Sequence, residues 1–258
     1  MGVVSVAAVT LAYTVDQGDV GGLDGDFAAL EHRIDAVIGI AVVPVGGSST
    51  PLNLGQWRSG PAWSTMKVPL VMAALRAQGS PHITPPMADA ITRSDNAAAE
   101  AIWAGLGDPA TAARKVQAVL SQAGDPTVVQ SRRVRPEYSA FGQTVWSLND
   151  QAHFLAVAAC DQRNVPVLTL MGQVDTSQLW GLGTLAGIRF KGGWGPYPSG
   201  RYLQRQMGLV TTPTGLSAVA IAAEPNSGTY NDAIRSLDSI ASWLSRHLGM
   251  LPAGRCRP

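Results

Sequence analysis

The chain has 258 residues, of which 46% are hydrophobic and 14% charged, and its formal net charge is +1. This composition excludes a disordered chain, and the length is enough to bury a substantial core in one compact body. The near-neutral charge argues against nucleic acid as a natural ligand and leaves little charge for recruiting a partner electrostatically.

The N-terminal segment, residues 1–25, is predicted to be apolar and then flexible. Met1–Val15 carries no charge and is mostly apolar, but it is too short to span a membrane, and no basic residue precedes it. A remnant of an export segment, an artificial start of the chain and a packed terminal element all fit this pattern. Residues 16–25 are rich in glycine and aspartate, which favours a flexible lead.

The next stretch predicts a helix and the start of a sheet. Helical spacing over Phe27–Ile34 predicts a helix that Asp26 caps. The continuous β-branched run Ala36–Val45 predicts a buried strand, and Pro51–Trp57 predicts its hairpin partner across a Gly-Gly-Ser-Ser turn. The apolar stretch Val68–Ala77 then predicts a buried helix.

The middle of the chain is predicted to be helical. Apolar periodicity predicts helices over Asn96–Leu106, Thr111–Gln122 and Leu148–Cys160. Between the last two of these, Gly124–Val145 contains two prolines, three arginines and no sustained period, which is typical of a long surface loop.

The last third predicts three strands and a terminal helix. The strands are expected over Gly187–Phe190, Gln206–Thr211 and Leu216–Ala222, and an amphipathic helix over Tyr230–Leu248. This order predicts an α+β fold in which both chain ends form one antiparallel sheet flanked by helices. We expect a single domain over residues 26–258, with a sheet lobe (26–62 and 185–258), a helical lobe (63–184) and a cleft between them.

Cysteine and histidine usage indicates no metal site and no cofactor. Cys160 lies in an apolar helical stretch and Cys256 near the C-terminus, so we expect neither a disulfide framework nor a metal-ligand spacing from them. The four histidines form no ligand pair and are expected to pack or to lie at the surface. They are His32, His82, His153 and His247.

Lysine is rare, because the chain holds sixteen arginines and only three lysines. Arginine meets most surface-charge needs, so a remaining lysine is favoured to serve chemistry that needs an amine able to lose its proton. Two of the three, Lys67 and Lys191, lie within short motifs, whereas Lys115 does not.

Three motifs occur in order along the chain: Ser64–Lys67 (Ser-x-x-Lys), Ser94–Asn96 (Ser-Asp-Asn) and Lys191–Gly193 (Lys-Gly-Gly). At i and i+3 of a first helical turn, Ser64 and Lys67 share one face, so the amine can polarise the hydroxyl. The helix N-terminus favours a neutral amine and a developing alkoxide. The combination predicts a serine nucleophile with a lysine general base.

Each motif alone also has a structural explanation. Ser64 could cap a helix beside a solvated Lys67, and Ser94–Asn96 could cap a helix that begins at Ala97. Lys191–Gly195 could be a strand that ends in a glycine-rich turn. The conjunction of the three in this order favours the chemical interpretation, and backbone amides near Ser64 and Lys191 would then form an oxyanion hole.

The segment Trp63–Leu70 resembles the nucleophile helix of the serine β-lactamase and penicillin-binding protein family, and Lys191–Gly195 resembles that family's Lys-Thr-Gly-x-Gly strand. The chain is similar to a divergent class A-like member over roughly Phe27–Leu248. The resemblance implies an acyl-enzyme at Ser64, no cofactor, and a small-molecule or peptidoglycan-peptide substrate. It also implies a monomer in the cell envelope or secreted; membrane association stays open.

The resemblance also implies roles for further residues. Ser94 would carry the proton to the leaving nitrogen, and Asn96 would hold the amide side chain of the substrate. Lys191 would support Ser94 and attract the substrate carboxylate. The backbone amide of Trp194 would be the second oxyanion donor.

Other substrate contacts implied by the resemblance lie on the same strand and beyond it. Gly193 would line the substrate, and Arg201 or Arg205 would meet its carboxylate. Two features depart from the family pattern near these residues: Gly192 replaces the hydroxyl residue that usually helps to bind that carboxylate, and Trp194 is bulky where the family is small. The interval of thirty residues from Ser64 to Ser94 is short, which predicts a reduced helical lobe.

Class A enzymes activate the deacylating water with a loop glutamate and an asparagine four residues later. The nearest match is Glu137, which is followed by Phe141 at the asparagine position. Glu137 is therefore a candidate base, and the alternative is a loop carboxylate paired with an arginine. Glu100 is expected to have a surface role.

These features predict a β-lactamase-like serine hydrolase that is acylated at Ser64 by β-lactams or D-alanyl peptides and deacylates slowly. A D-alanyl-D-alanine carboxypeptidase and a non-catalytic binding module that keeps the fold are the alternatives.

Overall fold

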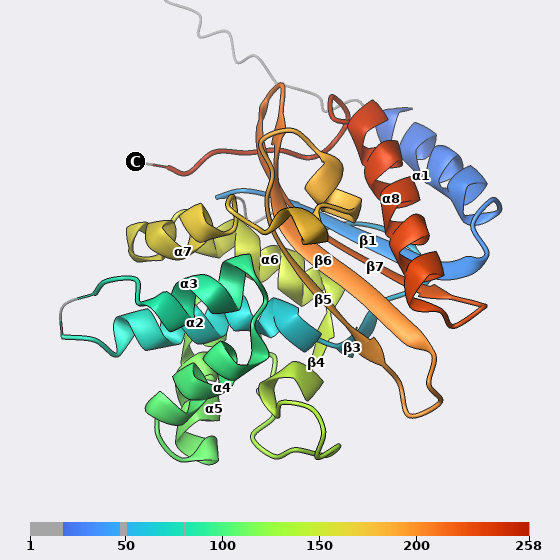
Figure 1. The fold of residues 1–258 in the computed structure, drawn as a ribbon. Coiled ribbons are helices and arrows are strands. Elements are labelled where there is room, and N and C mark those ends of the chain that lie inside the picture. The colour runs from blue at the N-terminus through green and yellow to red at the C-terminus, as the bar shows by residue number, and fades with distance from the viewer. Residues whose placement is uncertain (1–17, 47–50, 80, 258) are drawn as a thin grey trace, which may run out of the picture.

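A computed structural model describes residues 18–46, 51–79 and 81–257 (Figure 1). Its centre is a five-stranded antiparallel sheet in the order β2-β1-β7-β6-β5, and a small two-stranded sheet pairs β3 with β4. The strands are β1 (Ala36–Pro44), β2 (Leu52–Gly55), β3 (Ser59–Pro61), β4 (Val145–Ser147), β5 (Arg189–Pro196), β6 (Tyr202–Thr212) and β7 (Gly215–Pro225).

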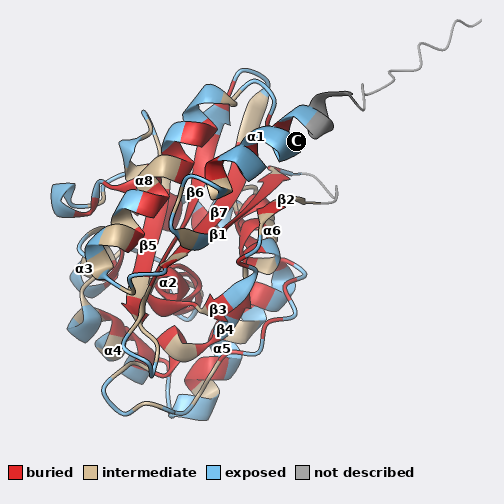
Figure 2. Ribbon diagram, turned by 90° about the vertical axis from the view of Figure 1, so that its right-hand side faces the viewer, coloured by how far each residue is buried: buried red, intermediate tan, exposed pale blue. Residues whose placement is uncertain are grey.

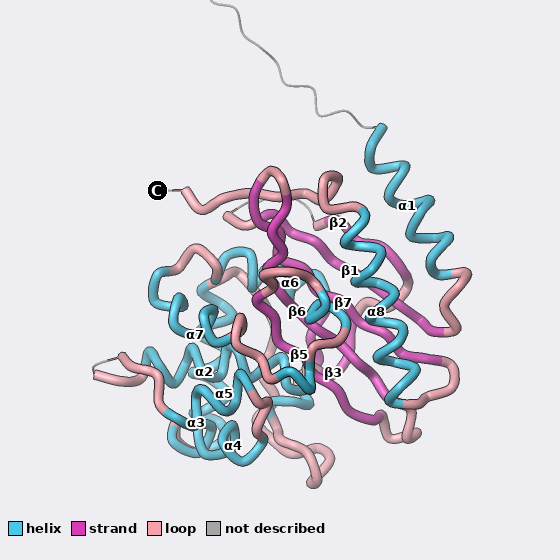
Figure 3. The backbone as a smooth tube through the Cα atoms, turned by 45° about the horizontal axis from the view of Figure 1, so that its top comes forward, coloured by secondary structure: helices cyan, strands magenta, loops and turns pink. Residues whose placement is uncertain are grey.

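Helices cover both faces of the large sheet. In Figures 1 and 3, α1 and α8 lie on one face, and the other helices form a lobe against the opposite face. The helices are α1 (Gly18–Glu31), α2 (Lys67–Arg76), α3 (Pro85–Thr92), α4 (Asn96–Gly105), α5 (Pro109–Gln122), α6 (Leu148–Ala158), α7 (Val165–Leu170) and α8 (Tyr230–Arg246). Short 3₁₀ turns are η1 (Trp63–Met66), η2 (Phe141–Gln143), η3 (Gln162–Asn164), η4 (Thr176–Gln178) and η5 (Gly181–Thr184).

The alternation of side chains along the strands divides the interior into two cores. Ile38 and Ile40 of β1 point to the α1 and α8 side, where Phe27 and Trp243 meet edge-to-face with ring centroids 5.0 Å apart. Ala41 of β1 and the alternate alanines Ala218, Ala220 and Ala222 of β7 point to the helical lobe. Small residues on that face let α6 lie close to the sheet, since successive strand residues face opposite sides.

The α+β prediction is confirmed. The early strand pairs with its hairpin partner, with Ile40 opposite Leu54, and β1 also pairs along its length with β7. The sheet is therefore assembled from both ends of the chain. Figure 2 shows α2 buried deep within the helical lobe, as expected for an apolar helix without a polar face.

Two predictions about the first part of the chain are wrong. Residues 18–25, predicted to be a flexible lead, belong to α1, which runs to Glu31. Asp26 therefore lies inside this helix and does not cap it; its carboxylate contacts His247 Nε2 at 3.0 Å. The helices α3 and α7 were also not predicted. Met1–Val15, residues 16–17 and most of the predicted hairpin turn lie outside the described residues.

The expectation that the cysteines form no disulfide is also wrong, because Cys160 and Cys256 are bonded with an S–S distance of 2.05 Å. The bond joins the segment after α6 to a C-terminal tail that runs beside β7. In this tail, Gly254 and Leu216 exchange two backbone hydrogen bonds of 2.8 and 3.0 Å. Two isolated cysteines carry no spacing pattern in the sequence, so only the fold reveals the pair.

Within residues 18–46, 51–79 and 81–257, no helix has both the length and the apolar character needed to cross a membrane. The same residues contain no cluster of three or more histidine, cysteine, aspartate or glutamate side chains suited to a metal ion.

Candidate active site

Ser64 lies in η1, immediately before the buried helix α2. Its neighbours Trp63 and Thr65 are buried, whereas Ser64 itself is partly exposed. The first turn is a 3₁₀ turn rather than the predicted α-helical turn. Pro69 explains this difference, because a proline ring would clash with the carbonyl four residues earlier in a continuous α-helix. The Ser64 hydroxyl makes no hydrogen bond to another described residue.

Two lysine side chains from distant parts of the chain converge on Ser94. Lys67 Nζ donates to the carbonyl oxygen of Ser94 at 2.5 Å and to Asn96 Oδ1 at 2.7 Å, and it lies 3.5 Å from Ser94 Oγ. Lys191 Nζ donates to Ser94 Oγ at 2.8 Å and to the Gly192 carbonyl at 3.0 Å. Both lysines are at most 1% exposed. The structure therefore brings the three sequence motifs together.

Burial governs the protonation of both amines. It lowers the pKa of Lys67 from 10.5 to about 7, against the smaller opposing effects of Asp95 and Glu100. Burial, and then repulsion by Lys67, lowers the pKa of Lys191 well below 10.5. Near neutral pH, Lys67 is thus poised between its charged and neutral forms, which is the property of a general base.

The backbone is held in unusual conformations at two points of this site. Trp63 has φ of 49° and Ser94 has φ of 57°, and these are the only described residues other than glycine with positive φ. Such conformations cost free energy and persist where surrounding structure enforces them, often at functional sites. At Ser94 the conformation directs both the carbonyl and the hydroxyl toward lysine amines.

Asp95 supports this arrangement from the start of α4. Its carboxylate accepts from Ala98 N at 2.7 Å, as an N-cap does, so within Ser94–Asn96 it is Asp95 that caps the helix. The helix begins at Asn96, as predicted, and ends at Gly105. We expect Asp95→Ala to lower the free energy of unfolding by about 1 kcal/mol, measured by urea denaturation, because an unsatisfied amide would remain. Asp95→Asn, which keeps the cap acceptor, should lose clearly less.

Two backbone N–H groups are available beside Ser64. The Ser64 amide lies in the first turn of η1, where helical N–H groups have no intrahelical acceptor. A Cβ on Gly193 would lie 2.9 Å from Ser64 N, so the glycine is needed for β5 to approach this turn.

The second N–H group belongs to Trp194, on the outer edge of β5. Phe190 N, four residues earlier, donates outward to the Met171 carbonyl, away from β6. Alternate residues of an edge strand point the same way, so the Trp194 N–H also points outward. Ser64 and Trp194 thus each present an N–H group without an acceptor among the described residues, as the donors of an oxyanion hole do.

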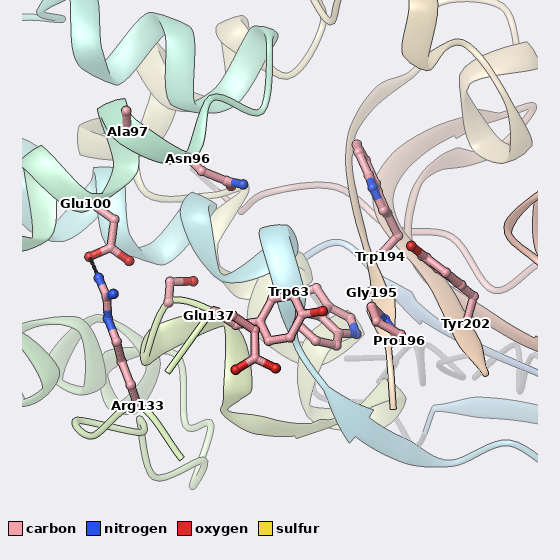
Figure 4. Close-up of a pocket in the computed structure, with 12 residues that line it drawn as sticks. Trp63, Asn96, Ala97, Glu100, Arg133, Glu137, Trp194, Gly195, Pro196 and Tyr202 are labelled. Carbon is pink, nitrogen blue, oxygen red and sulfur yellow. Dashed lines mark hydrogen bonds and ion pairs between the residues drawn. The ribbon is translucent and has the colours of Figure 1, made fainter. Parts of the chain in front are cut away.

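A cavity of about 380 Å³ is lined by Trp63, the chain neighbour of Ser64, and by Trp194 (Figure 4); Ser64, Ser94 and the two lysines are not among its lining residues. Aromatic side chains form much of its wall: Trp194 was expected near the substrate, whereas Trp63, Tyr138 and Tyr202 were not. Trp63 and Tyr138 meet edge-to-face with ring centroids 5.1 Å apart, and Trp194 and Tyr202 lie across the cavity from Asn96 in Figure 4. The lining residues are Trp63, Asn96, Ala97, Glu100, Arg133, Glu137, Tyr138, Ser139, Trp194, Gly195, Pro196 and Tyr202.

The two glutamates of this cavity are both paired with arginines. Glu137 pairs with Arg135 at 3.2 Å, its side chain is 55% exposed, and its carboxylate points away from Asn96 in Figure 4. This geometry favours the interpretation of Glu137 as a loop carboxylate paired with an arginine over its role as the deacylation base.

Glu100 lines the cavity and pairs with Arg133 at 2.7 Å, so the expectation that it has only a surface role is wrong. Its i, i+4 spacing from Asn96 could have placed it here.

Neither arginine proposed for the substrate carboxylate faces the cavity. Arg205 is fully buried on the helical side of the sheet, where its guanidinium donates to the carbonyls of Gly60, Pro61 and Trp146 and to Gln151 Oε1. It joins the small β3–β4 sheet to the large one, which corrects its assignment.

Arg201 is bound elsewhere as well. Its guanidinium lies 3.4 Å from Glu224 and donates to the carbonyls of Pro225 and Asn226 at the end of β7. Because these acceptors already occupy it, its assignment to the substrate is likewise not supported by the structure.

No family model matches this chain, and no curated protein matches its sequence. Solved structures do match its fold. The TLA-3 extended-spectrum β-lactamase superposes with a TM-score of 0.68 at 14% identity, over 87% of this chain and 99% of the other. A class A β-lactamase from Bacteroides cellulosilyticus gives 0.69 at 14% identity, over 88% and 97%. The enzyme from Mycobacterium abscessus gives 0.64 at 14% identity, over 86% and 99%. The chain therefore has the fold of class A β-lactamases.

Proposed function

Because the chain has the fold of class A β-lactamases, we propose that it is a serine acyl-transfer enzyme in which Ser64 is the nucleophile. The observation that carries the proposal is the convergence of Lys67 and Lys191 on Ser94 beside a partly exposed serine. A fold alone hosts many functions, so the argument depends on these contacts and not on the likeness.

The proposed reaction has two stages. Ser64 Oγ attacks the acyl carbon while its proton passes to neutral Lys67, and the N–H groups of Ser64 and Trp194 stabilise the charge on the carbonyl oxygen. The bond to the leaving group then breaks as Ser94 Oγ gives that group a proton. Ser94 Oγ regains a proton from the protonated amine of Lys67. Water hydrolyses the resulting ester in the second stage and restores the Ser64 hydroxyl.

Within this class, acylation by β-lactams or by D-alanyl peptides would use the same groups. Asn96 would hold the amide of the acyl side chain, although in the free protein its Oδ1 accepts from Lys67. Gly193 would let the substrate lie along β5. Release of D-alanine from a peptide, compared with nitrocefin hydrolysis, separates a peptidase from a β-lactamase.

Mass spectrometry of the intact protein tests acylation. After exposure to a labelled penicillin, we expect one adduct that maps to Ser64 and is absent from Ser64→Ala. Thr65→Ser is a suitable control for the mapping, because the Thr65 hydroxyl is buried and donates to the Ala62 carbonyl at 2.6 Å. Absence of an adduct at high drug concentration would argue against acylation of Ser64 by β-lactams.

Deacylation is expected to be slow, because no carboxylate in the described residues hydrogen-bonds Lys67 or the Ser64 hydroxyl. We predict that Glu137→Gln changes the lifetime of the adduct by less than about threefold, since its carboxylate is exposed and paired with Arg135. Glu100→Gln, at the second paired carboxylate, provides the matched comparison. A lifetime at least about a hundredfold longer in Glu137→Gln would identify that residue as the base after all.

The disulfide supports a location outside the cytoplasm. Disulfides persist in oxidising compartments and are rare where glutathione and thioredoxin keep thiols reduced. The bond between Cys160 and Cys256 therefore favours a secreted or cell-envelope protein. Detection of the bond in protein isolated under thiol-blocking conditions would test this.

A further inference from the structure

The cavity beside Ser64 has no unpaired cation among the described residues that line it. Arg133 is paired with Glu100 at 2.7 Å. Arg135, at its edge, is paired with Glu137 and donates to the Pro196 carbonyl at 2.5 Å. The charges of Arg133 and Arg135 are thus each balanced by a carboxylate, so neither is free to attract an anion.

The side-chain amines of Lys67 and Lys191 are also poorly placed to attract an anion. Lys191 is 0% exposed and bound by Ser94 and Gly192, and Lys67 is bound by Ser94 and Asn96. Neither lysine is among the residues that line the cavity, so a ligand there would lie against no lysine ammonium group. A carboxylate in this cavity would lose water and gain no charged partner.

The edge strand offers no hydroxyl at the position after Lys191, because Gly192 stands there. A Cβ on Gly192 would lie 3.5 Å from the Trp180 ring and 3.6 Å from the Trp194 ring. Trp180 and Trp194 meet edge-to-face at 5.7 Å, and Trp194 lies 6.3 Å from the ring of Tyr230. The side of β5 that could have carried a polar anchor is therefore lined by aromatic rings.

The aromatic side chains of the cavity wall, Trp63, Trp194 and Tyr202, are held in place by close packing. Trp63 is 6% exposed, and a Cβ on Gly195 would lie 2.6 Å from its ring, so the indole rests directly on β5. Tyr202 meets Tyr230 edge-to-face at 5.6 Å, which supports the rim beside Trp194. Rigid aromatic surfaces bind flat apolar groups through contact area and ring geometry.

We propose that this site prefers an acyl donor with an uncharged, aromatic or similarly flat apolar acyl group, and that donors with a carboxylate, penicillins included, acylate Ser64 more slowly. This inference rests on the acyl transfer proposed above and adds the class of substrate. The chemistry is unchanged: the acyl carbon forms an ester bond to Ser64 Oγ, its bond to the leaving oxygen or nitrogen breaks, and the proton leaves through Ser94.

Three p-nitrophenyl esters with one leaving group provide the test: phenylacetate, 4-carboxyphenylacetate and acetate. The rate of p-nitrophenolate release and the mass of the Ser64 adduct would be measured with the full chain. We expect the phenylacetyl ester to acylate Ser64 at least about tenfold faster than its carboxylated counterpart, and faster than the acetyl ester.

The outcomes separate this inference from the acyl transfer itself. Equal or faster reaction of the carboxylated ester, with acetate still acylating Ser64, would overturn the substrate class and leave the nucleophile intact. Failure of every ester and of penicillin to modify Ser64 would overturn both.

Two substitutions test the aromatic wall. Trp194→Ala should lose most of the preference for phenylacetyl over acetyl, whereas Trp194→Phe, which keeps a ring, should retain it. If Trp194→Ala kept the full preference while still reacting with p-nitrophenyl acetate, the wall would not select the acyl group and the inference would fail.

Discussion

Replacement of Lys67 by methionine is expected to lower the rate of Ser64 acylation by about 10³-fold, within the range that a positioned general base contributes. Lys67 is the amine nearest in sequence to the nucleophile, and it joins Ser94 and Asn96 through hydrogen bonds of 2.5 and 2.7 Å. Methionine preserves the length and apolar stem of the side chain but can accept no proton from Ser64. Pre-steady-state adduct formation, followed by mass spectrometry, measures this rate.

The pH dependence of the same rate is a second part of this prediction. Only neutral Lys67 can accept a proton, and its pKa of about 7 means that the neutral form grows as pH rises through 7. The acylation rate should therefore rise with pH through about 7 and then level off. A rate that fell with increasing pH over this window would contradict a neutral Lys67 as the base.

Lys67→Arg separates the loss of a base from the loss of a contact. Arginine keeps a positive charge and can still donate toward Ser94 and Asn96, but it does not deprotonate in this pH range. Both variants should therefore acylate slowly. If Lys67→Arg acylated at close to the rate of the unsubstituted protein, the amine would serve only to position Ser94.

The depressed pKa also links this lysine to stability. Between pH 7 and 10.5 the unfolded chain holds a proton on Lys67 that the folded protein has largely lost, so the free energy of unfolding due to this group rises with pH across that window. The contribution of this group should be absent from Lys67→Met. Urea denaturation of both proteins at pH 6, 8 and 10 measures the difference.

The local part of the site could be predicted from the sequence. Ser64 and Lys67 lie at the start of a buried helix as expected, but the Lys67 amine contacts Ser94 and Asn96 and not the Ser64 hydroxyl. Asp95 has the ordinary pattern of a helix cap. The likeness of Lys191–Gly195 to a known strand motif then indicated which remote segment completes the site. Fold class followed similarly, since β-branched runs at both ends of the chain favoured one shared sheet.

The features that the sequence did not predict depend on contacts between segments that are distant in the chain. Arg205 was assigned to the substrate, but a neighbouring sheet and α6 enclose it and bind its guanidinium, which pattern alone cannot reveal. The sequence of residues 18–25 has weak helix propensity, yet α1 forms there because Leu23 and Phe27 pack on the sheet. Tertiary packing overrides local preference in such cases.

Removal of the disulfide is expected to lower the free energy of unfolding by about 3–4 kcal/mol, since cross-links that close long loops restrict the unfolded chain most. Cys160 and Cys256 are 96 residues apart, so the closed loop is long. It encloses β5, β6, β7 and α8, and thus the strand that carries Lys191. Guanidinium denaturation of the double variant Cys160→Ser/Cys256→Ser measures the loss.

Part of the loss in unfolding free energy comes from the C-terminal tail around Cys256, because few other bonds attach this tail to the sheet. Gly254 exchanges two hydrogen bonds with Leu216, and Ser217 Oγ donates to the Pro252 carbonyl at 2.7 Å. These bonds should survive at least transiently without the disulfide, so the variant is expected to fold and to be acylated at Ser64, only with a lower unfolding midpoint.

A reductant supplies the matched control for this prediction. It should shift the unfolding midpoint of the unsubstituted protein toward that of the double variant and leave the variant unchanged. A shift worth less than about 1 kcal/mol would show that the tail contacts alone hold the C-terminus. A shift of the expected size means that a reducing compartment would remove a large share of the 5–15 kcal/mol by which domains are usually stable. The same bond that stabilises the sheet thereby favours folding outside the cytoplasm.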